Sequence, residues 1–119
     1  MEWKLNKNKP LMQQICEQVC LKIASGEFAP ESKLPSVREA AISMGVNPNT
    51  VQRAFENLEQ IGIIYSVRGS GSFVSPDIAK AKETILLILH QKTLEFFSEM
   101  QALGLDNEQI KKYVKELEL

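Results

Sequence analysis

The sequence predicts a mainly α-helical protein with a small β-hairpin, in which an N-terminal winged helix-turn-helix is followed by a two-helix tail. Three observations predict this fold class. Two helix starts lie close together between residues 34 and 58, two β-prone segments with a Gly-rich connection follow over residues 63–75, and the composition changes after residue 76. We therefore expect one domain over residues 1–75 and a helical tail over residues 76–119.

Length and composition are those of an ordinary globular protein. The 119 residues are 44% hydrophobic and 24% charged, which fits one small domain with an appendage. The longest apolar run, residues 85–89, is far shorter than the about 20 residues of a membrane span. The N-terminus has charges but no apolar core after them, which argues against a signal peptide. We expect a cytoplasmic protein that has no membrane partner.

The net charge of −1 argues against a protein that binds nucleic acid through a general positive field. Residues 1–75 contain 8 Lys or Arg against 7 Asp or Glu, and residues 76–119 contain 6 against 8, which together make the totals of 14 and 15. Neither part is basic. Any nucleic-acid binding must therefore come from cations placed locally on one surface.

A first helix is expected from Leu11 to Gly26, after a polar arm that ends in Pro10. Its apolar positions recur at helical spacing: Met12, Ile15, Cys16, Val19, Cys20 and Ile23. The two cysteines on this stripe are interpreted as small buried hydrophobic residues. No second Cys pair or nearby His completes a metal site, and a disulfide is not expected in a reducing compartment.

The next stretch predicts two short helices joined by a tight turn. Ser36 and Glu39 have the spacing of a capping box, and Gly45 suits the left-handed residue that ends a helix. Asn47 and Pro48 then start a second helix, because Pro has no N–H to leave unpaired at the first helical position. We expect helices over residues 36–44 and 48–61, which together form a helix-turn-helix.

Each of these two helices has an inner and an outer face. The inner faces are expected to bury Val37, Ala40, Ala41, Met44, Val51, Ala54, Phe55, Leu58 and Ile61. The outer face of the second helix carries Asn49, Gln52, Arg53 and Glu56, with Thr50 beside its first turn. Ser36 and Arg38 lie outside at the start of the first helix.

A β-hairpin is expected after Gly62. Residues 63–67 and 72–75 are β-prone, and the connection between them contains Arg68, Gly69 and Gly71. The tip is not a nucleotide loop, since it has neither a Lys-Ser/Thr pair nor a following helix. A hairpin after a helix-turn-helix is the order of elements in a winged helix.

The tail is expected to form a long helix to about Leu103 and, after Gly104, a short helix with Ile110, Val114 and Leu117 inward. Apolar residues cover more than one face of the long helix, and 44 residues enclose little core alone. We therefore predict a homodimer that forms mainly through Ile85, Ile88, Leu89, Phe96, Phe97, Met100 and Leu103. His90, the only histidine, is interpreted as a surface or interface residue rather than a ligand.

Across residues 10–74 the sequence resembles the GntR family of bacterial transcription regulators. The resemblance rests on a series of elements in order: residues 26–33, 34–39, 47–51 and 54–59, Gly62, and residues 68–74. The Asn-Pro-Asn-Thr-Val run with a short two-helix tail resembles the YtrA-type branch in particular. Other branches have larger C-terminal effector domains, which 44 residues cannot supply.

The resemblance implies double-stranded DNA as partner. The helix over residues 48–61 would lie in the major groove, and the hairpin tip would lie near the minor groove. Amide side chains suit adenine edges, Thr suits phosphate or a thymine methyl, and Arg suits guanine or phosphate. The expected DNA-binding residues are Ser36, Arg38, Asn47, Asn49, Thr50, Gln52, Arg53, Arg68 and Gly69. Many family members have Arg at the positions of Pro48 and Gln52, so their base preference does not transfer.

The resulting hypothesis is a sequence-specific regulator, a repressor that binds a palindromic operator as a homodimer. The alternative is a winged-helix adaptor that binds a protein and no specific DNA sequence, since fold alone does not give function. An enzyme is not expected, because no paired carboxylates, Cys-His pair, metal set or cofactor motif is present. A small-molecule effector near Phe96, Phe97 and Met100 remains an alternative to a simple dimer core.

Overall fold

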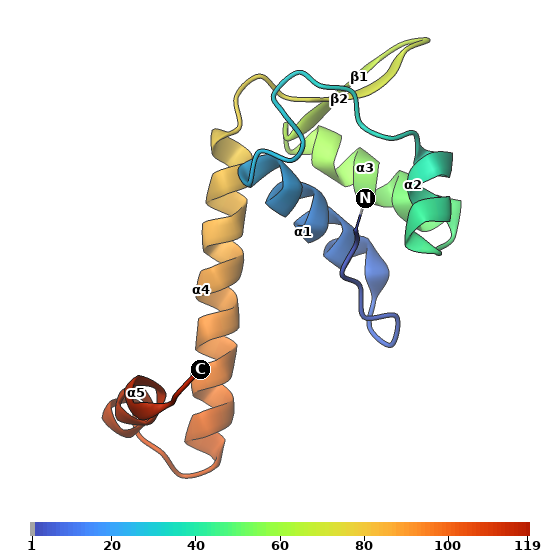
Figure 1. Ribbon diagram of the computed structural model, residues 1–119. Helices are drawn as coiled ribbons and strands as arrows, with labels where there is room; N and C mark the ends of the chain where they lie inside the picture. The colour runs from blue at the N-terminus through green and yellow to red at the C-terminus, as the bar shows by residue number, and fades with distance from the viewer. Residues whose placement is uncertain (1) are drawn as a thin grey trace. The chain divides into compact units, whose positions relative to one another are not determined.

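The computed structural model describes residues 2–119, so that Met1, the first residue of the expected 1–75 domain, lies outside them. The elements follow the order three helices, a hairpin and two helices (Figure 1). They are α1 (Leu11–Ala24), α2 (Val37–Met44), α3 (Pro48–Gln60), β1 (Ile64–Val67), β2 (Gly71–Val74), α4 (Ala79–Ala102) and α5 (Asn107–Glu116). The chain divides into two compact units, Met1–Ile85 and Leu86–Leu119. The domain boundary expected after residue 75 stays a prediction.

Helix α1 forms where the apolar periodicity predicts it. Ile15, Val19 and Ile23 recur on one face and are fully or almost fully buried. The helix ends at Ala24, and Gly26 then takes a φ of +88°, a left-handed conformation that side chains with a Cβ rarely adopt. The first helix is therefore confirmed, with its end two residues before the Gly.

Helices α2 and α3 are both capped by side chains at their N-termini. Ser36 and Glu39 form a complete capping box at α2, and the Asn47 side chain accepts from the backbone N–H of Asn49 at 2.8 Å at α3. Between them Gly45 has a φ of +69° and ends α2. Helix α3 packs on both α1 and α2, so that the turn is held by core contacts as well as caps.

The hairpin is a two-stranded antiparallel sheet that is bound to the chain before α2. Its register pairs Ile64 with Val74 and Val67 with Gly71. On the other edge of β2, the N–H of Leu34 donates to the Ser72 carbonyl at 2.8 Å, and the N–H of Val74 donates to the Ser32 carbonyl at 2.9 Å. The hairpin is thus fixed to the helix-turn-helix by backbone hydrogen bonds.

The core of the first unit is apolar and contains residues from α1, α2, α3 and the hairpin. Trp3 and Leu5 of the N-terminal arm pack against it, as do Ile78, just before α4, and Ile85 in α4, whereas Ala81 of α4 is itself part of the core. Segments that precede the hairpin in the chain and segments that follow it therefore contribute to one core.

The expectation that Ile61 is buried is wrong. Helix α3 ends at Gln60, and Ile61 is its C-terminal cap with 40% of its surface exposed. Gly62 then turns the chain at a φ of +84°, so that Ile63 and Ile64 enter the core instead. The Ile61 carbonyl accepts a hydrogen bond from Nζ of Lys80 at 3.0 Å.

In the second unit, the end of α4 is followed by Gly104 and a second capping box. Asp106 and Gln109 cap α5 reciprocally at 2.8 Å, and Ile110 is fully buried. Val114 and Leu117, expected inward, are 44% and 46% exposed within this chain, so that this expectation is wrong for a single copy. Leu117 follows the end of α5, and two helices enclose only a small volume.

Candidate nucleic-acid interface

The outer face of α3 presents a polar row of side chains to solvent. Asn49, Gln52, Arg53 and Glu56 are exposed, while Val51, Ala54, Phe55 and Leu58 on the inner face are buried. The helical period places these two sets on opposite faces, since burial of the apolar row directs the polar row outward. The sequence predicts both faces of a helix over residues 48–61, and the structure confirms them as far as Gln60.

The start of α2 carries Arg38 in an exposed position and Ser36 as its cap. The Ser36 hydroxyl oxygen accepts from the N–H of Glu39 at 3.0 Å, and a Glu39 carboxylate oxygen accepts from the N–H of Ser36 at 3.0 Å. The hydrogen bond from the Ser36 N–H lowers the pKa of Glu39. The Glu39 carboxylate thus already occupies the backbone N–H of Ser36, so that the hydroxyl hydrogen is the group of Ser36 that can donate to a phosphate.

Asn47 and Thr50 lie at the first turn of α3. The Asn47 side-chain oxygen is engaged in the cap of the helix, so that its amide hydrogens are the groups left for other partners. Thr50 is half-buried, and its N–H donates to the Asn47 carbonyl at 3.0 Å. Both residues are therefore held in place by the helix start.

The hairpin tip carries Arg68 and Gly69, both exposed, with Gly69 at a φ of +79°. The N–H of Ser70 donates to the Val67 carbonyl at 2.9 Å and closes the turn. Beside the tip, Lys33 lies so close to Gly71 that an added Cβ there would be 3.1 Å from Cε of Lys33. Lys33 is a cation of this surface that the sequence did not indicate, because the contact joins residues far apart in the chain.

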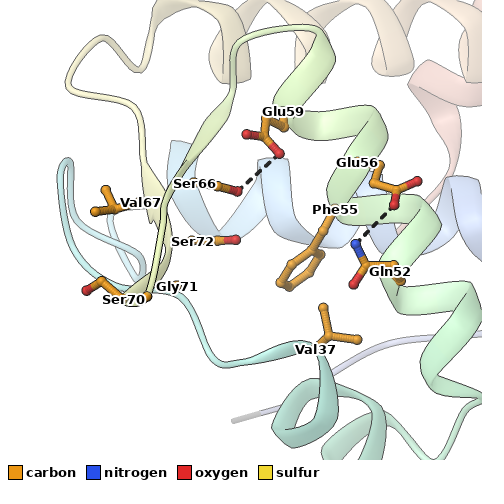
Figure 2. Close-up of a pocket in the computed structure, with 11 residues that line it drawn as sticks. Val37, Gln52, Phe55, Glu56, Glu59, Ser66, Val67, Ser70, Gly71 and Ser72 are labelled. Carbon is orange, nitrogen blue, oxygen red and sulfur yellow. Dashed lines mark hydrogen bonds between the residues drawn. The ribbon is translucent and has the colours of Figure 1, made fainter.

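A groove of about 380 Å³ lies between α3 and the hairpin (Figure 2). Val37 and Phe55 form part of its apolar lining, and Gln52, Glu56, Glu59, Ser66 and Ser72 are among its polar residues. Two side-chain hydrogen bonds lie in the lining of the groove, both at 3.1 Å. One joins Gln52 Nε2 to Glu56 Oε1 within α3, and the other joins Ser66 Oγ of β1 to Glu59 Oε2 of α3. Among residues 2–119, neither carboxylate lies within 4.0 Å of a cation.

The N-terminal arm is fixed to this unit by polar contacts that the sequence did not predict. Lys7 Nζ donates to the Gly45 carbonyl at 3.1 Å, and Trp3 Nε1 donates to Ser43 Oγ at 3.1 Å. The buried Lys22 ammonium forms an ion pair with Glu27 at 3.1 Å and lies 4.8 Å from the centre of the Trp3 ring. These contacts hold the arm against α1, against α2 and against the turn that follows α2.

The two cysteines have the environment of inert core residues. Burial raises the pKa of Cys16 to about 11 and that of Cys20 to about 12, so that both are protonated thiols at neutral pH. In the part of the chain that the structure describes, no cluster of three or more His, Cys, Asp or Glu residues has metal-binding geometry. Nor does any helix within residues 2–119 have the length and apolar character needed to cross a membrane.

Residues 11–74, from α1 to the end of the hairpin, match the family described as bacterial regulatory proteins, gntR family. The match covers more than half of the chain. The chain belongs to the GntR family. The resemblance of the sequence to this family is therefore confirmed, as is the fold class of a mainly helical chain with a winged helix-turn-helix.

Two relatives from Bacillus subtilis (strain 168) are similar along most of their length. The uncharacterised HTH-type transcriptional regulator YhcF is 36% identical over 116 residues, which are 97% of this chain and 95% of YhcF. The HTH-type transcriptional repressor YtrA is 34% identical over 115 residues, which are 91% of this chain and 84% of YtrA. The similarity includes the tail as well as the winged helix.

Two solved structures are similar to the parts of this chain that they cover. A GntR family transcriptional regulator from Listeria monocytogenes superposes with a TM-score of 0.82 and 38% identity, and the match covers 96% of this chain and all of that chain. The DNA-binding domain of AraR in complex with an operator superposes with a TM-score of 0.54 and 30% identity, over 63% of this chain and 94% of that chain. This GntR protein is therefore a transcription regulator with a DNA-binding domain, and not an enzyme.

Proposed function

We propose that this GntR regulator is a repressor that binds a palindromic operator as a homodimer. The observation that carries the proposal is the exposed polar face of α3 beside the Arg68 tip, with Arg38 at the start of α2. All three arginines of the chain are exposed in these elements. Cations are therefore placed locally on this surface, as DNA binding by a protein with a net charge of −1 requires. A related DNA-binding domain in complex with an operator supports DNA as the partner.

In this proposal α3 enters the major groove. Asn49 and Gln52 pair with base edges, and an amide can bond adenine through two hydrogen bonds. Arg53 reads guanine or binds the backbone, and Thr50 contacts a phosphate or a thymine methyl group. From the start of α3, the amide N–H groups of Asn47 donate to the DNA backbone.

The remaining contacts position the protein on the duplex. Ser36 and Arg38 bind phosphate from the start of α2, and Arg68 with Gly69 approaches the minor groove from the hairpin tip. Phosphate contacts of this kind supply affinity and register, whereas base contacts supply specificity. Such a regulator would act in the cytoplasm, because bacterial chromosomal DNA lies there.

The tail supplies the apolar surface for the dimer. Leu89 and Leu103 are 56% and 79% exposed, and Leu86, Leu87, Leu94 and Phe96 are also exposed. Full burial of one exposed leucine is worth about 2 kcal/mol, so that the exposed apolar residues of two copies together can offset an association cost in the range of about 4–15 kcal/mol. The proposed interface consists of Ile85, Ile88, Leu89, Phe96, Phe97, Met100 and Leu103.

A small-molecule effector is a further proposal for the same tail. Phe96 and Phe97 have ring centroids 6.1 Å apart, and Phe97 and Met100 are half-buried. We assign these residues first to the dimer core, because the tail has little surface to spare for a pocket. An increase in thermal stability with one compound of a metabolite panel would favour the effector.

Electrophoretic mobility shift at rising salt tests the proposal. The triple variant Arg38→Ala, Gln52→Ala, Arg68→Ala should lose sequence-specific binding, and Arg38→Ala alone should reduce the salt slope by about one phosphate contact. Lys112→Ala is the matched control, because it removes one exposed cation from α5. Unchanged affinity of the triple variant would contradict the proposal.

The alternative function is a protein-binding adaptor, which only the near-neutral charge supports. A pull-down that retains a protein partner but no DNA would favour the adaptor.

A further inference from the structure

Glu56 lies on the outer face of α3, one helical turn after Gln52. Its Oε1 accepts a hydrogen bond from Nε2 of Gln52 at 3.1 Å, and both side chains line the groove beside the hairpin (Figure 2). Both are exposed, and Glu56 has no cation within 4.0 Å in the part of the chain that is described. The carboxylate is therefore free of any ion pair that would draw it away from Gln52.

The chemistry of the two groups fixes the direction of this hydrogen bond. An ionised carboxylate only accepts, whereas an amide has two N–H donors on one side and a carbonyl acceptor on the other. Glu56 therefore pairs with the Nε2 side of Gln52. If the amide flipped, its carbonyl oxygen would face the carboxylate, and two acceptors would repel each other.

The orientation of an amide decides which purine it can read. Adenine presents one donor and one acceptor in the major groove, N6–H and N7, so that it pairs with a carbonyl and one N–H. Guanine presents two acceptors, O6 and N7, and pairs with two donors. An amide whose second N–H is bonded to Glu56 still has one N–H and its carbonyl for adenine, but it cannot turn both donors toward guanine.

We propose that Glu56 is a positioning residue for base specificity, which holds the Gln52 amide in the orientation that pairs with adenine and disfavours guanine. The proposal rests on the proposed function, in which α3 enters the major groove. A hydrogen bond between exposed side chains is weak in water, but it strengthens when DNA displaces the water around it. The effect is therefore expected in the complex, as selectivity, rather than in the stability of the free protein.

The test uses the full-length protein and a DNA site selected from a random pool. Fluorescence anisotropy measures affinity at fixed salt for sites that carry A·T or G·C at each position. The position at which Gln52→Ala changes the preference is the one that Gln52 faces. Wild type should prefer adenine there by on the order of tenfold. Glu56→Gln should bring this preference to within about threefold, because a glutamine at 56 can donate as well as accept and permits the flipped amide.

Glu59→Gln is the matched control. It removes the same charge from the same groove, one turn further along α3, where Glu59 accepts a hydrogen bond from Ser66 while Gln52 donates to Glu56. This variant should raise affinity for all sites alike and keep the adenine preference. In the Gln52→Ala background, Glu56→Gln should have no further effect on base preference, as expected for residues that act through one another.

Four results would overturn the proposal. They are a base other than adenine at the Gln52 position, an unchanged preference in Glu56→Gln, an equal loss of preference in Glu59→Gln, and an effect of Glu56→Gln that persists without Gln52. The last of these would mean that Glu56 contacts a base itself. Failure of the proposed function is a separate result, since wild type would then enrich no sequence from the random pool.

Discussion

Ser36 and Glu39 satisfy each other's backbone N–H at the start of α2, with both hydrogen bonds at 3.0 Å. The same pair lies next to Arg38, in the region that we assign to DNA contact. One short motif therefore both starts the first helix of the helix-turn-helix and sets the charge at its end. Two predictions follow from it, one on stability and one on pH.

Replacement of Ser36 by alanine should destabilise the protein by about 1 kcal/mol, because the N–H of Glu39 loses its acceptor at a helix N-terminus. Urea denaturation followed by circular dichroism measures the change. Ser70→Ala is the control, since Ser70 is an exposed serine at the hairpin tip, and it should change the free energy of unfolding by less than about 0.5 kcal/mol. Equal effects of the two variants would show that the capping box does not stabilise α2.

The Glu39 carboxylate gives stability a defined pH dependence. Its pKa in the folded protein lies below the ordinary value of 4.5, mainly because the Ser36 N–H donates to it. Its contribution should therefore be complete above pH 4.5 and be lost as the pH falls through the lowered pKa. Thermal denaturation between pH 7 and pH 3 should show a smaller loss of stability in Glu39→Gln than in wild type. Parallel curves would contradict this assignment.

Gly45 should be required for its backbone conformation. At a φ of +69°, alanine is strained, and Gly45→Ala should cost about 1–2 kcal/mol of stability. Asparagine tolerates this conformation better, so that Gly45→Asn should cost less than Gly45→Ala. Both variants add a Cβ that meets Nζ of Lys7 at 2.8 Å, and the comparison therefore isolates the backbone term. Denaturation curves in urea that coincide for the two variants would mean that the contact with Lys7 dominates.

The tail should determine the oligomeric state. Size-exclusion chromatography with light scattering should give twice the chain mass of 13.4 kDa for wild type and one chain mass for Leu89→Glu. The reason is that a carboxylate buried without a partner costs several kcal/mol. Leu21→Glu changes a leucine of similar exposure on α1 and should remain dimeric. A monomeric wild type would contradict the proposed dimer, and a dimeric Leu89→Glu would place the interface elsewhere.

The local elements could be predicted from the sequence because their signals are local. Caps at Ser36, Asn47 and Asp106 and left-handed glycines lie within a few residues of the helix ends that they define. The outer face of α3 followed from the helical period alone, once Val51 and Phe55 were assigned to the core. The GntR family was recognised from a series of such elements in order.

The remaining features depend on contacts between distant residues or on the surface available for burial. Hydrophobic character suggested that Ile61, Val114 and Leu117 are buried, but the helix ends and the small second unit leave them exposed. The contacts of Lys7 with Gly45 and of Lys33 with Gly71 join segments 38 residues apart in the chain, and no local pattern indicates them.

Selection of bound DNA from a random pool with the purified full-length protein tests the central claim most directly. We predict an enriched site with two-fold symmetry, whose half-sites lie about one helical turn (about 10–10.5 base pairs) apart, as a dimer with two α3 helices requires. Enrichment of no sequence would contradict sequence-specific binding, and enrichment of a single unpaired half-site would contradict binding as a symmetric dimer.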